Sequence, residues 1–139
     1  MFRPLRIAAV SVLCVLASCA DENVQGTEKA RVSSPDGVVD AVLIVKETDA
    51  TVATPSELYV VPKGTKPTKS AMIMRGDYFA NVSLKWKEPR FLELHYDTGR
   101  VFTFKNFWQS AEVSNNSYVV EIRLKPMRDS FSLGSVKSQ

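Results

Sequence analysis

Between residues 38 and 61 the chain carries two nearly continuous apolar segments. Val38–Val45 is a run rich in valine in which only Asp40 is polar, and Leu58–Val61 repeats the pattern. Such short β-branched runs are typical of strands that are buried on both faces. Ser33–Gly37 precedes the first run and combines proline, aspartate and glycine, the residues of a tight turn. We therefore predict a turn that leads into a central strand, with a second strand at 58–61.

In the second half of the chain, apolar and polar residues alternate. Val82–Lys87, Phe91–Tyr96 and Tyr118–Leu124 each place their apolar side chains on one face, which predicts half-buried strands. Asp97–Gly99 is expected to form a short hairpin loop, with Val101–Phe104 as the return strand. The residues expected to face the core are Val82, Leu84, Trp86, Leu92, Leu94, Tyr96, Val120, Ile122 and Leu124.

Shorter features complete the predicted fold. Met72–Met74 indicates a short apolar strand, and Arg75–Asp77 is read as a turn after it. Pro89 and Pro126 mark strand ends, because proline cannot donate a ladder hydrogen bond. Residues 105–113 fit either a bulged strand or one helical turn. The resulting six or seven short strands, with no helical period, predict an all-β domain, either an antiparallel β-sandwich or a small barrel.

The N-terminal segment has a different pattern. Arg3 and Arg6 precede an apolar run of about ten residues that ends at Leu16, and small residues follow it. These are the three parts of a secretory signal peptide. A membrane-spanning helix would need about 20 apolar residues, so the run is too short for one. We expect the chain to be exported.

Leu16-Ala17-Ser18-Cys19 resembles the lipobox of bacterial lipoproteins residue for residue. The resemblance implies that a diacylglycerol is attached to the Cys19 sulfur, that the signal is cut after Ser18, and that fatty acids such as palmitate hold the product on a membrane. The alternative is a soluble signal cut after Ala20, because small residues also precede that bond. We favour lipidation, since a plain secreted protein does not require a cysteine there.

The chain then divides into four parts. We assign 1–18 to a lipoprotein signal peptide, 19–30 to the lipidated cysteine and a flexible tether, 31–127 to the β domain and 128–139 to a polar tail. The lipoprotein resemblance further implies that an aspartate directly after the cysteine retains a protein at the inner membrane of enteric bacteria. Ala20 stands there, so an outer-membrane location is favoured over the inner membrane, although Asp21 follows.

A second resemblance rests on the first half of the domain. Ser34-Pro35-Asp36-Gly37 before a strand rich in valine, followed by Leu58–Val61, is similar to a family of small bacterial lipoproteins of unknown function. Where that family has a Gly-Ala-Thr-Thr loop, this chain has Asp49-Ala50-Thr51-Val52. The resemblance implies a location in the cell envelope and no activity.

Removal of the signal changes the charge and cysteine arguments. The net charge of +3 counts 18 Lys and Arg residues, and without Arg3 and Arg6 there remain 16 against 15 acidic residues. A nearly neutral chain does not support nucleic-acid binding. Cys14 leaves with the signal and Cys19 carries lipid, so the domain must be stabilised by apolar burial rather than by a disulfide. With His95 as the only histidine, we expect no metal site and no cofactor.

Few residues offer catalytic chemistry. His95 and Asp97 stand two apart on one strand face, without a nucleophile motif nearby, and we expect the histidine to face solvent. Glu93 and Glu121 are candidates to lie opposite each other across two strands, as the acids of glycosidases do. The favoured interpretation is the polar outer face of a sheet. We assign no catalytic residue.

Two groups of residues are candidate binding surfaces. The aromatic side chains of Phe104, Phe107 and Trp108 suit stacking on a sugar or filling a partner's pocket. The favoured alternative is that they close one end of the core. Lysines recur every three residues in the loop after the second strand, where they would contact an anionic surface or keep the loop solvated, the latter being favoured. These lysines are Lys63, Lys66 and Lys69.

The sequence therefore predicts an envelope lipoprotein without enzymatic activity. Its partners would be the membrane, through lipid on Cys19, and an envelope protein or glycan bound by the β domain. One alternative is a hydrolase that acts on an envelope polymer through carboxylates. The other is a structural subunit of an envelope assembly.

Overall fold

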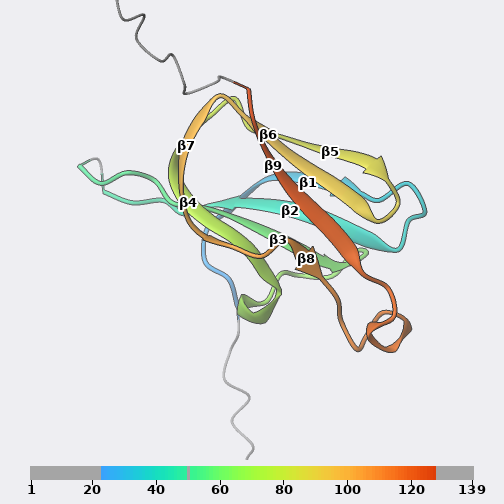
Figure 1. Cartoon of the computed structure of the whole chain (residues 1–139). Helices are drawn as coiled ribbons and strands as arrows, with labels where there is room; N and C mark the ends of the chain where they lie inside the picture. The colour runs from blue at the N-terminus through green and yellow to red at the C-terminus, as the bar shows by residue number, and fades with distance from the viewer. Residues whose placement is uncertain (1–22, 50, 128–139) are drawn as a thin grey trace, which may run out of the picture.

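The computed structural model describes residues 23–49 and 51–127 (Figure 1). In this part of the chain nine strands form two sheets, and two short 3-10 turns lie at Lys69–Ala71 (η1) and Ser114–Asn116 (η2). The strands are β1 Thr27–Ser33, β2 Val39–Val45, β3 Ser56–Pro62, β4 Met72–Ala80, β5 Ser83–Glu88, β6 Phe91–Tyr96, β7 Thr98–Phe104, β8 Phe107–Trp108 and β9 Val120–Pro126.

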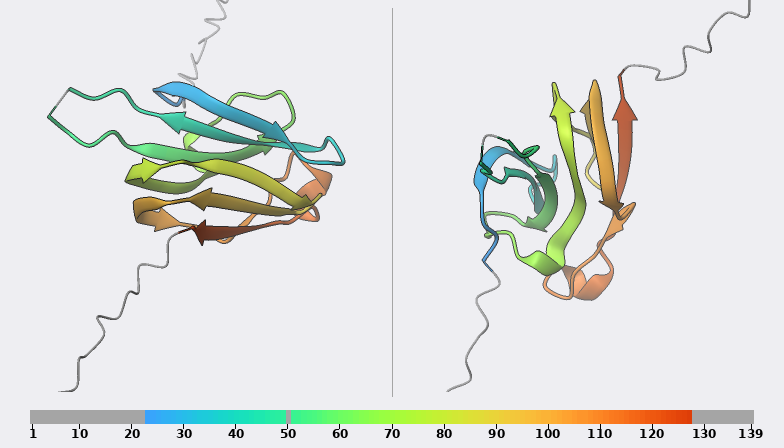
Figure 2. Two further views of the ribbon diagram at one scale, coloured as in Figure 1. Left: turned by 90° about the horizontal axis from the view of Figure 1, so that it is seen from above. Right: turned by 90° about the vertical axis from the view of Figure 1, so that its left-hand side faces the viewer.

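The two sheets pack face to face as a β-sandwich (Figure 2). The first sheet has the strand order β1-β2-β3-β4-β7, and the second has the order β5-β6-β9-β8. All neighbouring strands are antiparallel except β6 and β9, which are parallel. The predicted all-β class and the sandwich are confirmed, whereas the barrel alternative is wrong because the two sheets do not join into one.

One apolar core fills the space between the sheets. Every side chain that the alternation predicts to face inward belongs to this core or packs against it. The Trp86 indole N–H also donates to the Val32 carbonyl at 2.9 Å, which joins β5 to β1 at one side of the sandwich. The fully buried members include Val39, Ala41, Leu58, Val60 and Met74 from the first sheet and Leu92, Leu94 and Val120 from the second.

The strands β2 and β3 are buried on both faces, as their continuous apolar runs predict. Their outward side chains form a second cluster of Val42, Ile44, Tyr59 and Val61. Val24 covers this cluster together with Ala71 at the end of η1 and Met72 at the start of β4. The five-stranded sheet therefore has an apolar layer on each side.

The predicted turn before β2 is confirmed. Gly37 has a φ of +70°, which favours glycine, and its N–H donates to the Ser34 carbonyl at 2.8 Å. The Asp36 carboxylate accepts hydrogen bonds of 2.6 Å from the Ser34 hydroxyl and from the Tyr118 hydroxyl. Since Tyr118 lies two residues before β9, the turn also links the two sheets.

The boundary predicted between the tether and the β domain is wrong for residues 27–30. These residues belong to β1, which pairs with β2 from Thr27 opposite Val45 to Ser33 opposite Asp40. An edge strand with a largely exposed face needs no apolar period, so its polar sequence resembles a linker. The signal peptide, Cys19 and the polar tail lie outside the described residues.

The turn predicted at Arg75–Asp77 is also wrong, because β4 continues through it to Ala80. A methyl group on Gly76 would lie 2.1 Å from the carbonyl oxygen of Arg100, so glycine serves the close approach of β7. Asp77 is buried against the side chain of the same Arg100. Glycine and aspartate are therefore required here by strand packing rather than by a turn.

The hairpin predicted at Asp97–Gly99 is wrong as well. β7 does follow β6 at once, but it pairs with β4 in the first sheet, and the Asp97 N–H donates to the Ala80 carbonyl at 2.9 Å. The chain changes sheets at this corner, which local turn residues do not reveal. Residues 105–113 contain the short strand β8 and a loop. No helix in the described part of the chain is long and apolar enough to cross a membrane.

Candidate interaction surfaces

The sequence offered two roles for Phe104, Phe107 and Trp108, a binding surface or the closure of one end of the core. The structure divides the three residues between these roles. Trp108 is only 6% exposed and belongs to the main core. Phe107 is 54% exposed and Phe104 36%. Phe104 and Phe107 are therefore accessible to a partner, while Trp108 is not, and binding itself stays a prediction.

A more open aromatic group lies on β4 and β7. It consists of Tyr78, Arg100 and Phe102, called the Arg100 cluster below. The guanidinium carbon of Arg100 lies 4.7 Å from the centre of the Tyr78 ring and 5.6 Å from that of Phe102. Asp77, which is buried, accepts hydrogen bonds of 2.8 and 2.7 Å from Nε and Nη2 of Arg100. The buried carboxylate thus fixes the guanidinium, while Tyr78 is 63% exposed and Phe102 59%.

Irregular backbone geometry brings these side chains together. Two register shifts interrupt the ladder between β4 and β7. Tyr78 has a φ of +55°, a conformation that bulky residues rarely adopt. Its neighbour Phe79 packs against the main core, edge to face with Tyr96 at 5.2 Å between ring centres. Gly99 makes room for Phe79, since a methyl group there would lie 2.3 Å from the ring. The bulge therefore exposes Tyr78 and packs the following residue, Phe79, against the core.

The electrostatics keep the cluster charged. The hydrogen bond from Arg100 holds the pKa of the Asp77 carboxyl below its ordinary value, and the same contact raises the pKa of Arg100. Sequence analysis missed this cluster, because its residues come from two strands and meet only through the β4–β7 register. The one local signal was the pair of aromatic residues in segments of otherwise mixed polarity.

The three loop lysines do not lie together. All three are exposed, and the Nζ of Lys63 lies against the Gly37 turn, 3.5 Å from the position of a methyl group there. Lys66 borders a hollow beside β8, whereas Lys69 lines a different cavity on the outer face of the first sheet. Thr68, between them, forms a β-bridge with Asn23, the first described residue. Their contact with an anionic surface stays a prediction.

The cavity lined by Lys69 has a volume of about 350 Å³ and is called the Glu57 cavity below. The Glu57 side chain is 3% exposed. Its Oε1 lies 3.0 Å from Nζ of Lys46 and 3.6 Å from Nε of Arg75. Its Oε2 accepts a hydrogen bond from the hydroxyl of Tyr59, whose pKa is raised by burial and by this carboxylate. The remaining lining residues are Val24, Gln25 and Met72.

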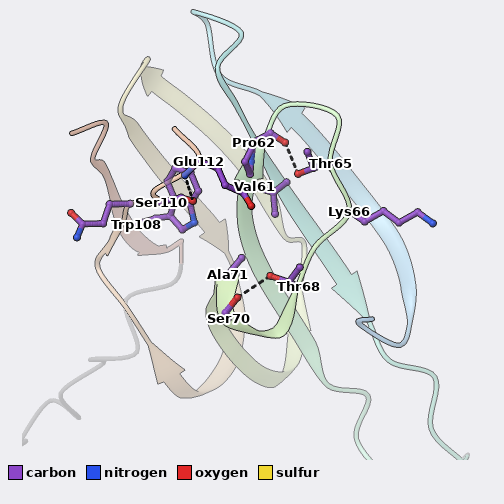
Figure 3. A pocket seen from close by; sticks show the side chains of 11 residues that line it. Val61, Pro62, Thr65, Lys66, Thr68, Ser70, Ala71, Trp108, Ser110 and Glu112 are labelled. Atoms are coloured by element: carbon purple, nitrogen blue, oxygen red, sulfur yellow. Dashed lines mark hydrogen bonds between the residues drawn. The ribbon is translucent and has the colours of Figure 1, made fainter. Parts of the chain in front are cut away.

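A hollow of about 460 Å³ lies between the end of β3 and the segment that follows β8 (Figure 3). Val61 and Pro62 border one side, and Trp108 borders the other. The Lys66 side chain points away from the hollow in Figure 3. The Thr65 hydroxyl donates to the Pro62 carbonyl at 2.8 Å, so this polar group of the wall is bonded within the protein. We assign no ligand to the hollow.

The carboxylate pair predicted across two strands is not formed. In the β6–β9 ladder Glu93 lies opposite Arg123, and Glu121 lies opposite Phe91. Glu121 binds Arg123 at 2.8 Å, whereas Glu93 is buried and lies 2.7 Å from Nε2 of His95. This hydrogen bond lowers the pKa of Glu93. His95 is therefore half-buried beside a carboxylate rather than facing solvent, which corrects that prediction.

Within the described residues, no three His, Cys, Asp or Glu side chains lie close enough together to hold a metal ion. Comparison with known proteins adds no relative. No protein-family model, no curated protein and no solved structure matches the chain.

Proposed function

We propose that the chain is a lipoprotein of a bacterial cell envelope whose β-sandwich binds another envelope protein without catalysing a reaction. The lipid anchor is supported by Leu16-Ala17-Ser18-Cys19 behind a basic and apolar segment. Fatty chains on Cys19 would hold the domain at the bilayer. Ala20 after the cysteine favours the outer membrane.

The Arg100 cluster is the observation that carries the binding role. Tyrosine, phenylalanine and arginine are enriched in the cores of protein interfaces, and tyrosine and arginine are frequent hot spots. Because Asp77 already fixes the guanidinium, little side-chain entropy is lost when a partner covers the cluster. Arg100 and Phe102 also belong to β7, an edge strand of the first sheet, along which a partner can add a strand.

The position of the cluster suits a protein held by its N-terminus. The first and last described residues lie at opposite ends of the sandwich (Figure 1). Asn23 forms a β-bridge with Thr68, so the first described residue lies near the start of β4. Tyr78 stands six residues after Met72, the first residue of β4, which corresponds to about 20 Å along the strand. The proposed binding surface would therefore lie away from the anchored end.

The binding role is tested by recovering partners from detergent-solubilised membranes with the tagged native chain. We expect one envelope protein to be recovered in stoichiometric amount and lost by at least about tenfold with Tyr78→Ala or Phe102→Ala. Met127→Ala is the matched control, because Met127 is also 60% exposed but lies outside the cluster. Equal recovery with all variants would contradict the proposal.

The anchor is tested separately by mass spectrometry of the native product. We expect a chain that begins with a diacylglycerol-modified Cys19 and that fractionates with the outer membrane. An unmodified thiol, or a chain that begins at Asp21, would refute the anchor.

A further inference from the structure

We infer that the Glu57 cavity is a docking site for the anionic headgroup of a membrane phospholipid. This inference rests on the proposed lipid anchor and adds the face by which the anchored domain meets its own bilayer. It is carried by the charge of the cavity, by the chemistry of its lining and by the position of the first described residues.

The cavity has an excess of positive charge. Lys46, Lys69 and Arg75 line it with one carboxylate, Glu57. Since Glu57 is buried and lies 3.0 Å from Lys46 and 3.6 Å from Arg75, it positions two of the cations. Three cations against one anion leave two positive charges, which matches a phosphate diester flanked by other anionic headgroups.

The rest of the lining is largely apolar, with Gln25 as the additional polar residue. Tyr59 and Met72 contribute from β3 and β4, and Val24 contributes from the N-terminal segment. A cavity of about 350 Å³ whose lining includes both apolar and cationic side chains accommodates a small amphipathic group. The phosphate would contact the cations, and the glycerol would pack against the apolar side chains.

The chain path brings the cavity close to the anchor. Val24 and Gln25 line the cavity, and Asn23 is bridged to Thr68, next to Lys69. Cys19 stands four residues before Asn23, a separation of at most about 14 Å even in an extended chain. This reach is comparable to the distance of about 10 Å over which an anionic surface attracts cations at physiological salt. The cavity is therefore held where phospholipid headgroups are concentrated.

The test measures the rate at which an amine-reactive ester labels each lysine of the native protein in vesicles. Phosphatidylcholine vesicles with and without phosphatidylglycerol are compared. We expect the anionic lipid to slow labelling of Lys46 and Lys69 by about fivefold, as expected for about one favourable charge contact each. Lys63 is the internal control, because it belongs to the same loop but lies at the Gly37 turn. Equal slowing of Lys63 and Lys69, or no slowing at Lys69, would overturn the inference.

A second arm separates the cavity from the anchor. The detergent-solubilised native chain is titrated with dihexanoyl phosphatidylglycerol, dihexanoyl phosphatidylcholine or inorganic phosphate, and Lys69 labelling is followed. We expect protection by phosphatidylglycerol alone, weakened about fivefold by Lys69→Ala and unchanged by Lys63→Ala. Equal protection by phosphate would indicate a free-anion site and overturn the lipid assignment. If this arm succeeds while Cys19 proves unmodified, the anchor is wrong and the cavity assignment holds.

Discussion

The outer faces of the two sheets differ sharply, although both sheets share one core. On the first sheet, Tyr59 and its apolar neighbours are buried beneath Val24 and the start of β4. On the second sheet, the outward positions of β5 and β9 hold exposed charged residues, and no described segment covers them. These residues are Lys85, Lys87, Glu121, Arg123 and Lys125.

The difference shows how the hydrophobic pattern reports the layers of the fold. A continuous apolar run such as Val38–Val45 requires a layer on each side, so it predicts a cover as well as a strand. An alternating strand such as β6 requires only the core. The cover is also what forms the Glu57 cavity, because Val24 and Gln25 border it.

The largest test of this comparison replaces one aromatic side chain on each outer face. Tyr59→Ala should lower the free energy of unfolding by about 3–5 kcal/mol, because the side chain is buried and fills the second cluster. Phe91→Ala should lower it by only about 1 kcal/mol, because Phe91 is half-buried and its ring lies under the guanidinium of Arg123. Urea unfolding followed by tryptophan fluorescence measures both values. Equal losses would mean that the two outer faces are energetically alike.

The next test compares a carboxylate on each outer face. Asp40 is buried and accepts hydrogen bonds from the Ser33 hydroxyl, the Gly64 N–H and Arg31 at 2.6–2.9 Å. Burial favours a higher pKa, but these hydrogen bonds prevail and lower the pKa of Asp40. Asp40→Asn should lower the free energy of unfolding by about 1–3 kcal/mol at neutral pH. The NH2 group of asparagine would face N–H and O–H donors that now donate to the carboxylate, and at least one of these hydrogen bonds would be lost.

The sign of the pH dependence follows from the lowered pKa. The ionised Asp40 carboxylate stabilises the fold fully above its unfolded-state pKa of about 3.9, and this contribution is lost as the pH falls through the lower folded-state value. The difference between wild type and Asp40→Asn should therefore shrink in urea unfolding below about pH 4. Glu121→Gln, at an exposed position, should differ little from wild type at any pH. A gap that stays constant into acid would exclude this role for Asp40.

The smallest effect distinguishes the cations of the two faces. Lys46→Ala removes one partner of the buried Glu57 and should cost about 1 kcal/mol. Lys85→Ala, on the exposed face of β5, should change the stability by no more than about 0.5 kcal/mol. Thermal unfolding of both variants at the same pH measures the difference. If Lys85→Ala lowers the stability more than Lys46→Ala does, exposed charges on the second sheet contribute more to stability than we expect.

The sequence predicted the strands that carry a strong apolar pattern. It did not predict the features that depend on which strands pair with each other. β2 was recognisable by its continuous apolar run, and β6 and β9 by the alternation of apolar and polar side chains, because burial determines both patterns. β1 was not, since an edge strand can be polar throughout. Gly76 and Asp97 were read as turn residues, although one accommodates a neighbouring backbone and the other marks a change of sheet.

The candidate surfaces were predictable only in part for the same reason. The sequence identified Phe104 and Phe107 as aromatic residues worth attention, but it could not separate them from Trp108, because exposure depends on the partner sheet. The Arg100 cluster needs the β4–β7 register and its bulges, which no local pattern encodes. Likewise, the spacing of the loop lysines gave no hint that only Lys69 reaches the Glu57 cavity.

The parallel pairing of β6 with β9 has a consequence for biogenesis. Among the described strands β9 is the last in the chain, yet it lies in the interior of its sheet, between β6 and β8. A nascent chain that ends before Val120 can pair β5 with β6 but lacks the strand that joins β8 to them. Completion of the second sheet, and with it of the core that the two sheets share, therefore waits for residues 120–126.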